Sequence, residues 1–273
     1  MCYLCGQNQK NINMNKSNTI KCLCFVAMML VAGYSAKAQL THLEQSIYLN
    51  FNLPTAQFND DVMTNALGDQ IPMTCFNAGK NAVFGFGLGY RVSYRFDVGF
   101  GEVSPYFHGD LQWNRVSGGM RDRYMNAGDG SAPNYFNVPL YVGVNYRYQL
   151  TDIFTPFGEF GIGPDFFLIT KESGTIEVPA SGNPGDPGYV AAHSYDFKLR
   201  YQMTCNVAWQ IGAGSYFGQH VSASLHYSGY GKHAIKYNGG APTEDQLANA
   251  DASVTATQTR SVGMLSLRIG FHF

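Results

Sequence analysis

The last ten residues of the chain, Met264 to Phe273, alternate between apolar and polar side chains without a break. Successive side chains of a β-strand point to opposite faces, so this segment as a strand has one wholly apolar face and one polar face. Helical periodicity does not fit, because the apolar positions recur at every second residue. The apolar face consists of Leu265, Leu267, Ile269, Phe271 and Phe273.

Seven further segments repeat this alternation. The clearest runs from Phe84 to Asp97, with Phe, Leu, Tyr and Val at the even positions and Gly, Arg and Ser between them. Alternation over seven or more residues predicts a strand with one apolar face. We therefore expect eight strands, at 47–53, 84–97, 103–114, 136–149, 159–168, 197–211, 220–228 and 264–273.

The connections between these segments alternate in length. An up-and-down sheet places every second connection at the same end, so the pattern predicts long loops at one end and tight turns at the other. Long loops beside short turns are typical of outer-membrane barrels, in which the turns are periplasmic and the loops extracellular. The long connections are 54–82, 116–134, 171–195 and 231–257, and the short ones are 99–102, 151–155 and 217–219.

Together these features resemble the small outer-membrane β-barrel family, which includes OmpA-like, OmpX-like and PorT-like barrels. The resemblance implies an all-β fold: an eight-stranded antiparallel up-and-down transmembrane β-barrel with long extracellular loops and short periplasmic turns, located in the cell outer membrane. In that family a terminal aromatic residue preceded by alternating apolar residues is the signal that the barrel-assembly machinery recognises. The matching residues here are Ile269, Phe271 and Phe273.

The N-terminus predicts export. Lys16 and Lys21 precede the apolar run 22–33, and an Ala-x-Ala site ends at Ala38, which is the pattern of a secretory signal peptide. The apolar run has about 12 residues, too short for a bilayer crossing of ~20. We expect a signal peptide at 1–38, with Met14 as an alternative start, and a single barrel domain at 39–273.

A soluble eight-stranded barrel such as a lipocalin shows the same alternation, with the apolar face lining a ligand cavity. Three features favour the membrane barrel. Several segments reach the ~9–11 residues of a tilted bilayer crossing. Aromatic residues gather near the segment ends, with Trp209 and Phe197 among them, as in interfacial girdles, and the terminal Phe273 has no role in a lipocalin.

If the apolar face meets lipid, the polar face fills the barrel. An eight-stranded barrel is only wide enough for side chains to fill it. Charges of both signs in such a space predict paired, hydrogen-bonded networks, and glycines on the same face leave room for long side chains. The expected interior charge network is Arg91, Arg95, Asp110, Arg147, Glu159, Asp165, Lys198, Arg200 and Arg268.

Enzymatic and metal chemistry find little support in the sequence. His108 and Asp110 share the polar face, as do Ser224, His226 and Ser228, but an enzyme acting on lipid needs its residues at the lipid-facing surface. No metal-ligand spacing is present, so we expect no catalytic site, no metal and no cofactor. Removal of residues 1–38 leaves Cys75 and Cys205, which we expect to stay free thiols.

The expected function is that of an integral outer-membrane barrel with a structural or surface-interaction role through its long loops. A narrow channel or a secretion accessory is the alternative, and a lipid-modifying enzyme is a third. Its partners are then membrane lipid, the barrel-assembly machinery and an extracellular or periplasmic protein. Residues 1–38 hold four lysines and no acid, so the mature chain has 14 basic and 19 acidic residues, which disfavours nucleic acid as a partner.

Overall fold

The computed structural model describes residues 42–60, 62–64, 70–72, 80–118, 121, 130–178, 180, 182, 184–185, 189, 191–236 and 257–273. The chain divides into two compact units, Met1–Leu43 and Glu44–Phe273. The expected signal peptide at 1–38 and Cys75 lie outside the described residues, so both expectations stay predictions. Cys205 is a free and exposed cysteine.

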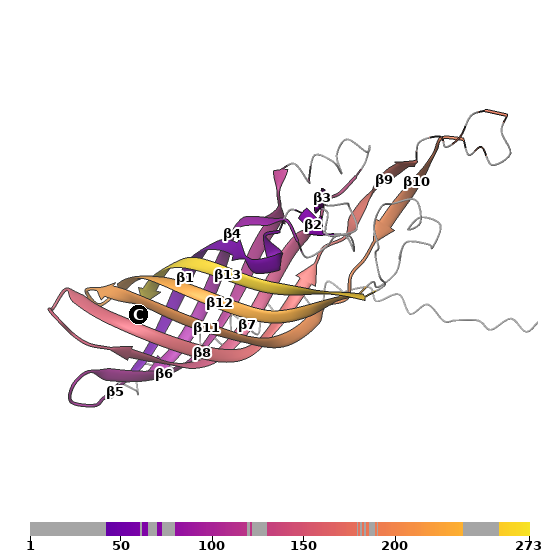
Figure 1. Cartoon of the computed structure of the whole chain (residues 1–273). Helices are drawn as coiled ribbons and strands as arrows, with labels where there is room; N and C mark the ends of the chain where they lie inside the picture. Colours follow the sequence, from indigo (N-terminus) through magenta and orange to yellow (C-terminus); the bar gives the residue numbers. More distant parts are fainter. Residues whose placement is uncertain are drawn as a thin grey trace, which may run out of the picture. The chain divides into compact units, whose positions relative to one another are not determined.

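Eight strands close into an antiparallel barrel (Figure 1). Each strand pairs with the next barrel strand along the chain, and the first pairs with both the second and the last. Ile47 lies opposite Phe271, and Leu53 lies opposite Leu265. The barrel strands are β1 (Leu43–Thr55), β4 (Ala82–Tyr94), β6 (Glu102–Val116), β7 (Asn134–Arg147), β8 (Phe154–Ile169), β11 (Thr204–Phe217), β12 (Val221–Lys236) and β13 (Thr257–His272).

The seam between β1 and β13 continues to the last residue. Phe273 and Gln45 exchange two backbone hydrogen bonds, at 3.0 and 3.1 Å. Ile269 and Phe271 face outward beside them, and Phe273 therefore completes the closing ladder. Whether the three residues also act as the assembly signal stays a prediction.

The remaining elements lie in the connections. β5 (Phe96–Asp97) extends the turn-end side of the sheet along β6. A 3₁₀ turn, η1 (Ala56–Phe58), follows β1, and a small hairpin is formed by β2 (Val62–Thr64) and β3 (Gln70–Pro72). A second hairpin, β9 (Glu172–Val178) with β10 (His193–Leu199), extends the long connection between β8 and β11. All but β5 lie in the long connections.

The segment predicted as one strand at 197–211 is two strands. Residues up to Leu199 belong to β10, which pairs with β9 instead of a barrel neighbour, and β11 starts only at Thr204. Side-chain alternation reports the two faces of a strand but not which strand lies beside it. A hairpin outside the barrel therefore continues the pattern without a visible break.

β12 and β13 are longer than predicted. Their pairing continues past a register shift between Gly229 and Gly231 as far as Lys236 and Thr257. Before the shift the even-numbered side chains of β12 are buried, and after it the odd-numbered His233 and Ile235 are. A β-bulge inserts one residue and so exchanges the two faces. This phase change hides the second half of the strand from a simple alternation test.

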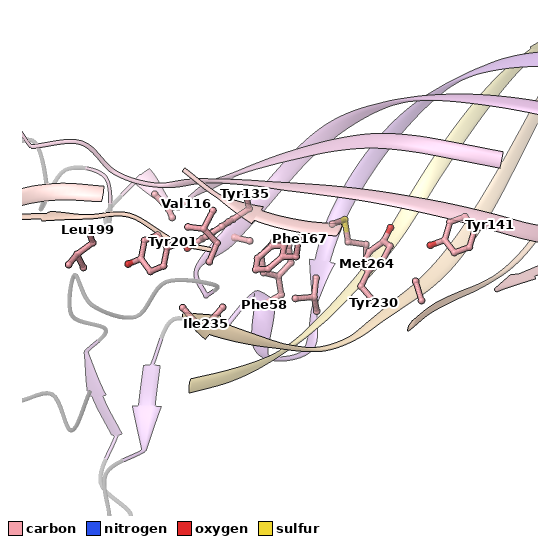
Figure 2. Close-up of a cluster of buried hydrophobic side chains, with 14 of the residues drawn as sticks. Phe58, Val116, Tyr135, Tyr141, Phe167, Leu199, Tyr201, Tyr230, Ile235 and Met264 are labelled. Carbon is pink, nitrogen blue, oxygen red and sulfur yellow. The ribbon is translucent and has the colours of Figure 1, made fainter. Parts of the chain in front are cut away.

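An apolar cluster occupies the loop end of the barrel interior (Figure 2). Phe58 of η1 is fully buried there, with its ring centroid 5.2 Å from Tyr135 and 5.9 Å from Phe167. Just before it, Ala56 has a φ of 56°, a left-handed conformation in which the chain leaves β1. We call this set the mouth cluster; its members include Phe58, Val116, Tyr135, Phe167, Ile169, Tyr230, Ile235, Val262 and Met264.

Candidate functional site

The barrel is apolar outside and polar inside. Leu88, Val142 and Leu225 are 56%, 62% and 58% exposed, whereas Asp110 and Arg268 are 3% and 1% exposed. A soluble barrel such as a lipocalin turns its apolar side chains inward. Here the apolar side chains point outward, which excludes the lipocalin alternative. A closed sheet with a continuous apolar outer band and a polar interior is the form in which strands cross lipid.

The chain is an outer-membrane type β-barrel. Its strands pair all round the barrel, and its apolar band needs bilayer lipid as solvent. Among the described residues, no helix is long and apolar enough to cross a membrane.

Aromatic residues border the apolar band, with two exceptions to the expected positions. Phe96, Tyr146 and Tyr148 are exposed at the turn end. Trp209, expected at the turn end, lies opposite Gly229 and Ile162, nearer the loop end of β11. Phe197, expected at the loop end of a barrel strand, belongs to β10 outside the barrel. The girdle is therefore assembled from fewer residues than the sequence predicted.

A buried group of four charged side chains crosses the middle of the barrel; we call Arg91, Asp110, Glu159 and Arg268 the central charge layer. Arg91 Nη1 and Nη2 donate to the two carboxylate oxygens of Glu159 at 2.7 and 2.6 Å. Arg268 Nη2 donates to Asp110 Oδ2 at 3.0 Å, and its Nη1 lies 3.5 Å from Glu159 Oε1. Two cations and two anions thus balance in a space closed to solvent.

Arg268 links the layer across the barrel. From β13 it contacts acceptors on four other strands: Asn50 at 2.9 Å, Asp110, Glu159, and Gln210 at 3.3 Å. The planar guanidinium suits such a role because its donors point in fixed directions. Removing this side chain would leave two carboxylates with one cation between them.

Aromatic rings line the charges, and small residues make room for them. Arg91 lies over the ring of Tyr106 at 4.1 Å and of Tyr48 at 4.9 Å, so both rings add cation–π attraction. A Cβ at Gly161 would come within 2.7 Å of the Tyr106 hydroxyl, and one at Gly143 would overlap the same ring. The interior glycines accommodate tyrosine, histidine and aspartate more directly than the arginines for which the sequence suggested them.

A second charged group lies at the turn end of the barrel. Arg147 donates from Nη1 to Glu44 at 3.1 Å and from Nε to Glu102, and His272 Nδ1 lies 3.3 Å from Glu44. Arg95 Nε lies 3.8 Å from the same glutamate. Glu44 and Glu102 were not among the expected network residues. Glu44 continues the inward even-numbered positions of β1, so extending the alternation backward from Tyr48 by two steps, through Ser46, would have found it.

The expected charge network is thus divided between levels. Arg91, Asp110, Glu159 and Arg268 lie together in the centre, and Arg147 and the partly exposed Arg95 lie at the turn end. Asp165 lies apart from both, near the loop end, 3.2 Å from His233. Lys198 and Arg200 are exposed, and their expected place in the interior was wrong because the chain has left the barrel at β10.

Two serine–histidine–carboxylate chains run through the interior. His226 Nε2 lies 2.8 Å from Ser224 Oγ, and its Nδ1 lies 3.5 Å from Glu159. The order of the three groups is that of a nucleophile, a base and an orienting acid, but His226 Nδ1 makes no hydrogen bond to the carboxylate among the described residues. Moreover, Ser224 and His226 are buried and point into the barrel, away from lipid, and Arg91 already holds Glu159.

A similar chain joins Ser222, His272 and Glu44 nearer the turn end. In the described part of the chain, no group of three or more His, Cys, Asp or Glu side chains is placed to hold a metal ion.

Comparisons with known proteins give neighbours of low similarity. No family model and no curated protein matches the chain. Similar solved structures include the attachment invasion locus protein Ail of Yersinia pestis, with 14% identity and a TM-score of 0.36 over 85% of this chain and 99% of that chain. The outer membrane protein OprG from Pseudomonas aeruginosa has 13% identity and a TM-score of 0.37 over 85% and 94%. The outer membrane enzyme PagL has 13% identity and a TM-score of 0.34 over 82% of this chain and 97% of that chain.

A first prediction concerns the lipid-facing band. Leu225→Arg puts a charge on the outer face beside Leu267 and should destabilise the barrel by about 2–4 kcal/mol in lipid vesicles, because lipid solvates the charge poorly. Ile153→Arg, at an exposed turn tip, should cost about 0–1 kcal/mol near the interface. Reversible urea unfolding in vesicles measures both. Equal small losses would mean that Leu225 faces water.

A second prediction concerns the central charge layer. Arg91→Met leaves Glu159 without its bidentate partner and should cost about 3–5 kcal/mol in the same unfolding assay. Arg91→Met combined with Glu159→Gln should cost less than the sum of the two single changes, because the buried charge is gone. Lys198→Met, which removes an exposed charge outside the barrel, should change stability by less than about 0.5 kcal/mol. Additive effects of the pair would contradict the layer as described.

Proposed function

We propose that this protein is a sealed surface barrel, which holds its long loops outside the cell for interaction with other molecules. The observation that carries the proposal is that the barrel interior is filled. Two of its levels are occupied by side chains: the mouth cluster at the loop end and the central charge layer beneath it. A general diffusion pore needs a continuous aqueous lumen, and an eight-stranded barrel with these contents leaves little width for one.

The mouth cluster supports the proposal because it ties the first long connection to the barrel. Phe58 packs against both Tyr135 and Phe167, and the Tyr135 hydroxyl donates to the backbone oxygen of Lys80 at 2.8 Å. The backbone of Asn81 also donates to Asp60 at 3.0 Å. These contacts hold both ends of the connection between β1 and β4 against the barrel mouth, as a scaffold for a loop requires.

The β9–β10 hairpin supports the same proposal. It continues the long connection between β8 and β11, and an isolated bridge between Ser131 and Ser173 joins its base to the connection between β6 and β7. Tyr201 also donates through its hydroxyl to Glu172, across the base of the hairpin. Neighbouring long connections are thereby fixed to each other, which gives a partner a preformed surface and lowers the entropic cost of binding.

We infer no enzymatic role. In the Ser224–His226–Glu159 chain only the serine is within hydrogen-bond distance of the histidine, a lipid substrate would have to pass the sheet to reach it, and Arg91 competes for the same carboxylate. A narrow channel is the second candidate function, since the interior charges outline a polar path. We place it behind the sealed barrel because the balanced ion pairs and the apolar mouth cluster both oppose ion entry at neutral pH.

The test of the proposal replaces residues 172–199 with a short Gly-Ser linker, which removes the β9–β10 hairpin and keeps all eight barrel strands. Cells producing the intact protein should be retained on a panel of immobilised matrix and serum glycoproteins several-fold more than cells producing the shortened one. Retention counts at equal surface amounts measure the difference.

The matched control is Ile153→Ser, at a short turn on the opposite end of the barrel, which should retain cells like the unchanged protein. Folding of each variant is checked by its shift in gel mobility on boiling. Equal retention with and without the hairpin, on every surface of the panel, would count against a loop-mediated interaction.

A further inference from the structure

Four histidine–carboxylate pairs lie along the inside of the barrel, and the sealed-barrel function proposed above makes no use of them. His272 pairs with Glu44 at the turn end, at 3.3 Å. In the centre His108 Nε2 lies 2.9 Å from Asp110 and His226 Nδ1 lies 3.5 Å from Glu159. The fourth pair, His233 with Asp165 at 3.2 Å, lies toward the loop end. An ion crossing the barrel would pass each of these levels in turn.

His108 and His226 contact the carboxylates of the central charge layer, and this region is neutral only while both histidines are neutral. Arg91 and Arg268 balance Asp110 and Glu159, so protons on His108 and His226 would add two positive charges. All six side chains are 5% exposed or less. An uncompensated charge in such a space is costly, and the cost is relieved when water or a counter-ion enters.

Both histidines contact the same carboxylate oxygens as Arg268. His108 Nε2 and Arg268 Nη2 both meet Asp110 Oδ2, and His226 Nδ1 and Arg268 Nη1 both meet Glu159 Oε1. A protonated histidine would therefore compete with Arg268 for the same carboxylate oxygen. The ion pairs weakened in this way are those of the side chain that links five strands across the lumen.

Among the described residues, the only carboxylates paired with the two histidines are Asp110 and Glu159. Around His108 are the rings of Tyr48, Tyr106 and Tyr141, with Arg91 opposite on β4. His226 lies 2.8 Å from Ser224 and 3.5 Å from Glu159 of β8, and Glu159 is in turn paired with Arg91 of β4 and Arg268 of β13. Both of these carboxylates are already paired with arginines, so no unpaired carboxylate of the central charge layer remains to balance an added proton.

The layer also contains polar atoms that water would satisfy. His108 Nδ1, Arg91 Nε and Asn145 Oδ1 are buried without a hydrogen-bond partner among the described residues. At the loop end the His233 ring lies 5.1 Å from Phe167, which in turn packs on Phe58.

We propose that the barrel is an acid-opened ion path that prefers anions. At neutral pH the paired charges and the mouth cluster close the lumen. In acid His108 and His226 take up protons, the hold on Arg268 weakens, water enters, and the net positive central charge layer admits small anions such as chloride. Histidine in water titrates near pH 6.5. Each histidine that gains its proton on hydration favours the open form by about tenfold per pH unit below that value.

The test records single barrels in planar bilayers with a chloride salt gradient, at about pH 7.5 and about pH 4.5, on either side of the histidine value. The intact protein should be silent at the higher pH and show reproducible openings at the lower pH, with a reversal potential of the sign that anion flow gives. Silence at both pH values, or openings that prefer cations, would overturn the proposal.

Variants separate this mechanism from a general loosening of the barrel in acid. His108→Gln with His226→Gln keeps hydrogen-bonding groups in the interior and should lower the acid-induced open fraction by at least about tenfold. His193→Gln, in β10 outside the barrel, is the matched control and should open like the unchanged protein. Openings unchanged in the double variant would contradict the proposal.

Each protein is first shown to be folded by its gel-mobility shift, and if the double variant does not fold, the single variants His108→Gln and His226→Gln replace it. Openings at the higher pH would contradict the sealed barrel, whereas silence throughout contradicts only this inference.

Discussion

Lipid offers no hydrogen bonds, and this constraint determines the rest of the structure. A sheet in lipid must pair every backbone donor and acceptor, so it must close, and closure here depends on the seam between β1 and β13 that ends at Phe273. The same solvent requires an apolar outer face, which leaves the polar half of each strand for the inside. The barrel interior is too narrow for bulk water, so the polar side chains that it encloses have to form hydrogen bonds and ion pairs with one another.

The interior solves this problem in different ways along its length. Charges of opposite sign meet in the centre and at the turn end, while the loop end is filled by apolar and aromatic groups around Phe58. Arg268 joins five strands and thus makes the centre one unit. Because the histidines contact the same oxygens as this arginine, stability and any response to acid depend on the same few contacts. Because the charges of the layer balance, each added proton leaves it with a net positive charge.

Most of the fold was predictable from the sequence, because side chains alternate between the two faces of a strand and lipid requires one of those faces to be apolar. The eight strands, their order and the uneven connections all follow from that alternation and from turn lengths. The predictions failed where alternation carries no information. The bulge at Gly229–Gly231 exchanges the faces of β12, and the 197–211 segment keeps its phase while changing its pairing partner.

The sequence predicted that charged side chains would pair inside the barrel, but not all of the residues that do so. Alternation placed Arg91, Asp110, Glu159 and Arg268 inward, where they meet, but it could not tell which levels of the barrel each reaches. Lys198 and Arg200 were assigned inward by phase alone and lie outside. Phe58 gave no signal, because a loop residue that turns back into a barrel mouth has no periodicity to detect.

The central claim is that these strands cross lipid with their apolar side outward, and a depth profile tests it most directly. Spin labels placed one at a time at Val221, Ala223, Leu225 and Tyr227 on β12 report collisions with oxygen, which is enriched in lipid, and with a water-soluble nickel complex. The account predicts that oxygen collisions dominate at Ala223 and Leu225 and that nickel collisions are low there. High nickel collisions at all four positions would show that this face meets water, and the membrane barrel would be wrong.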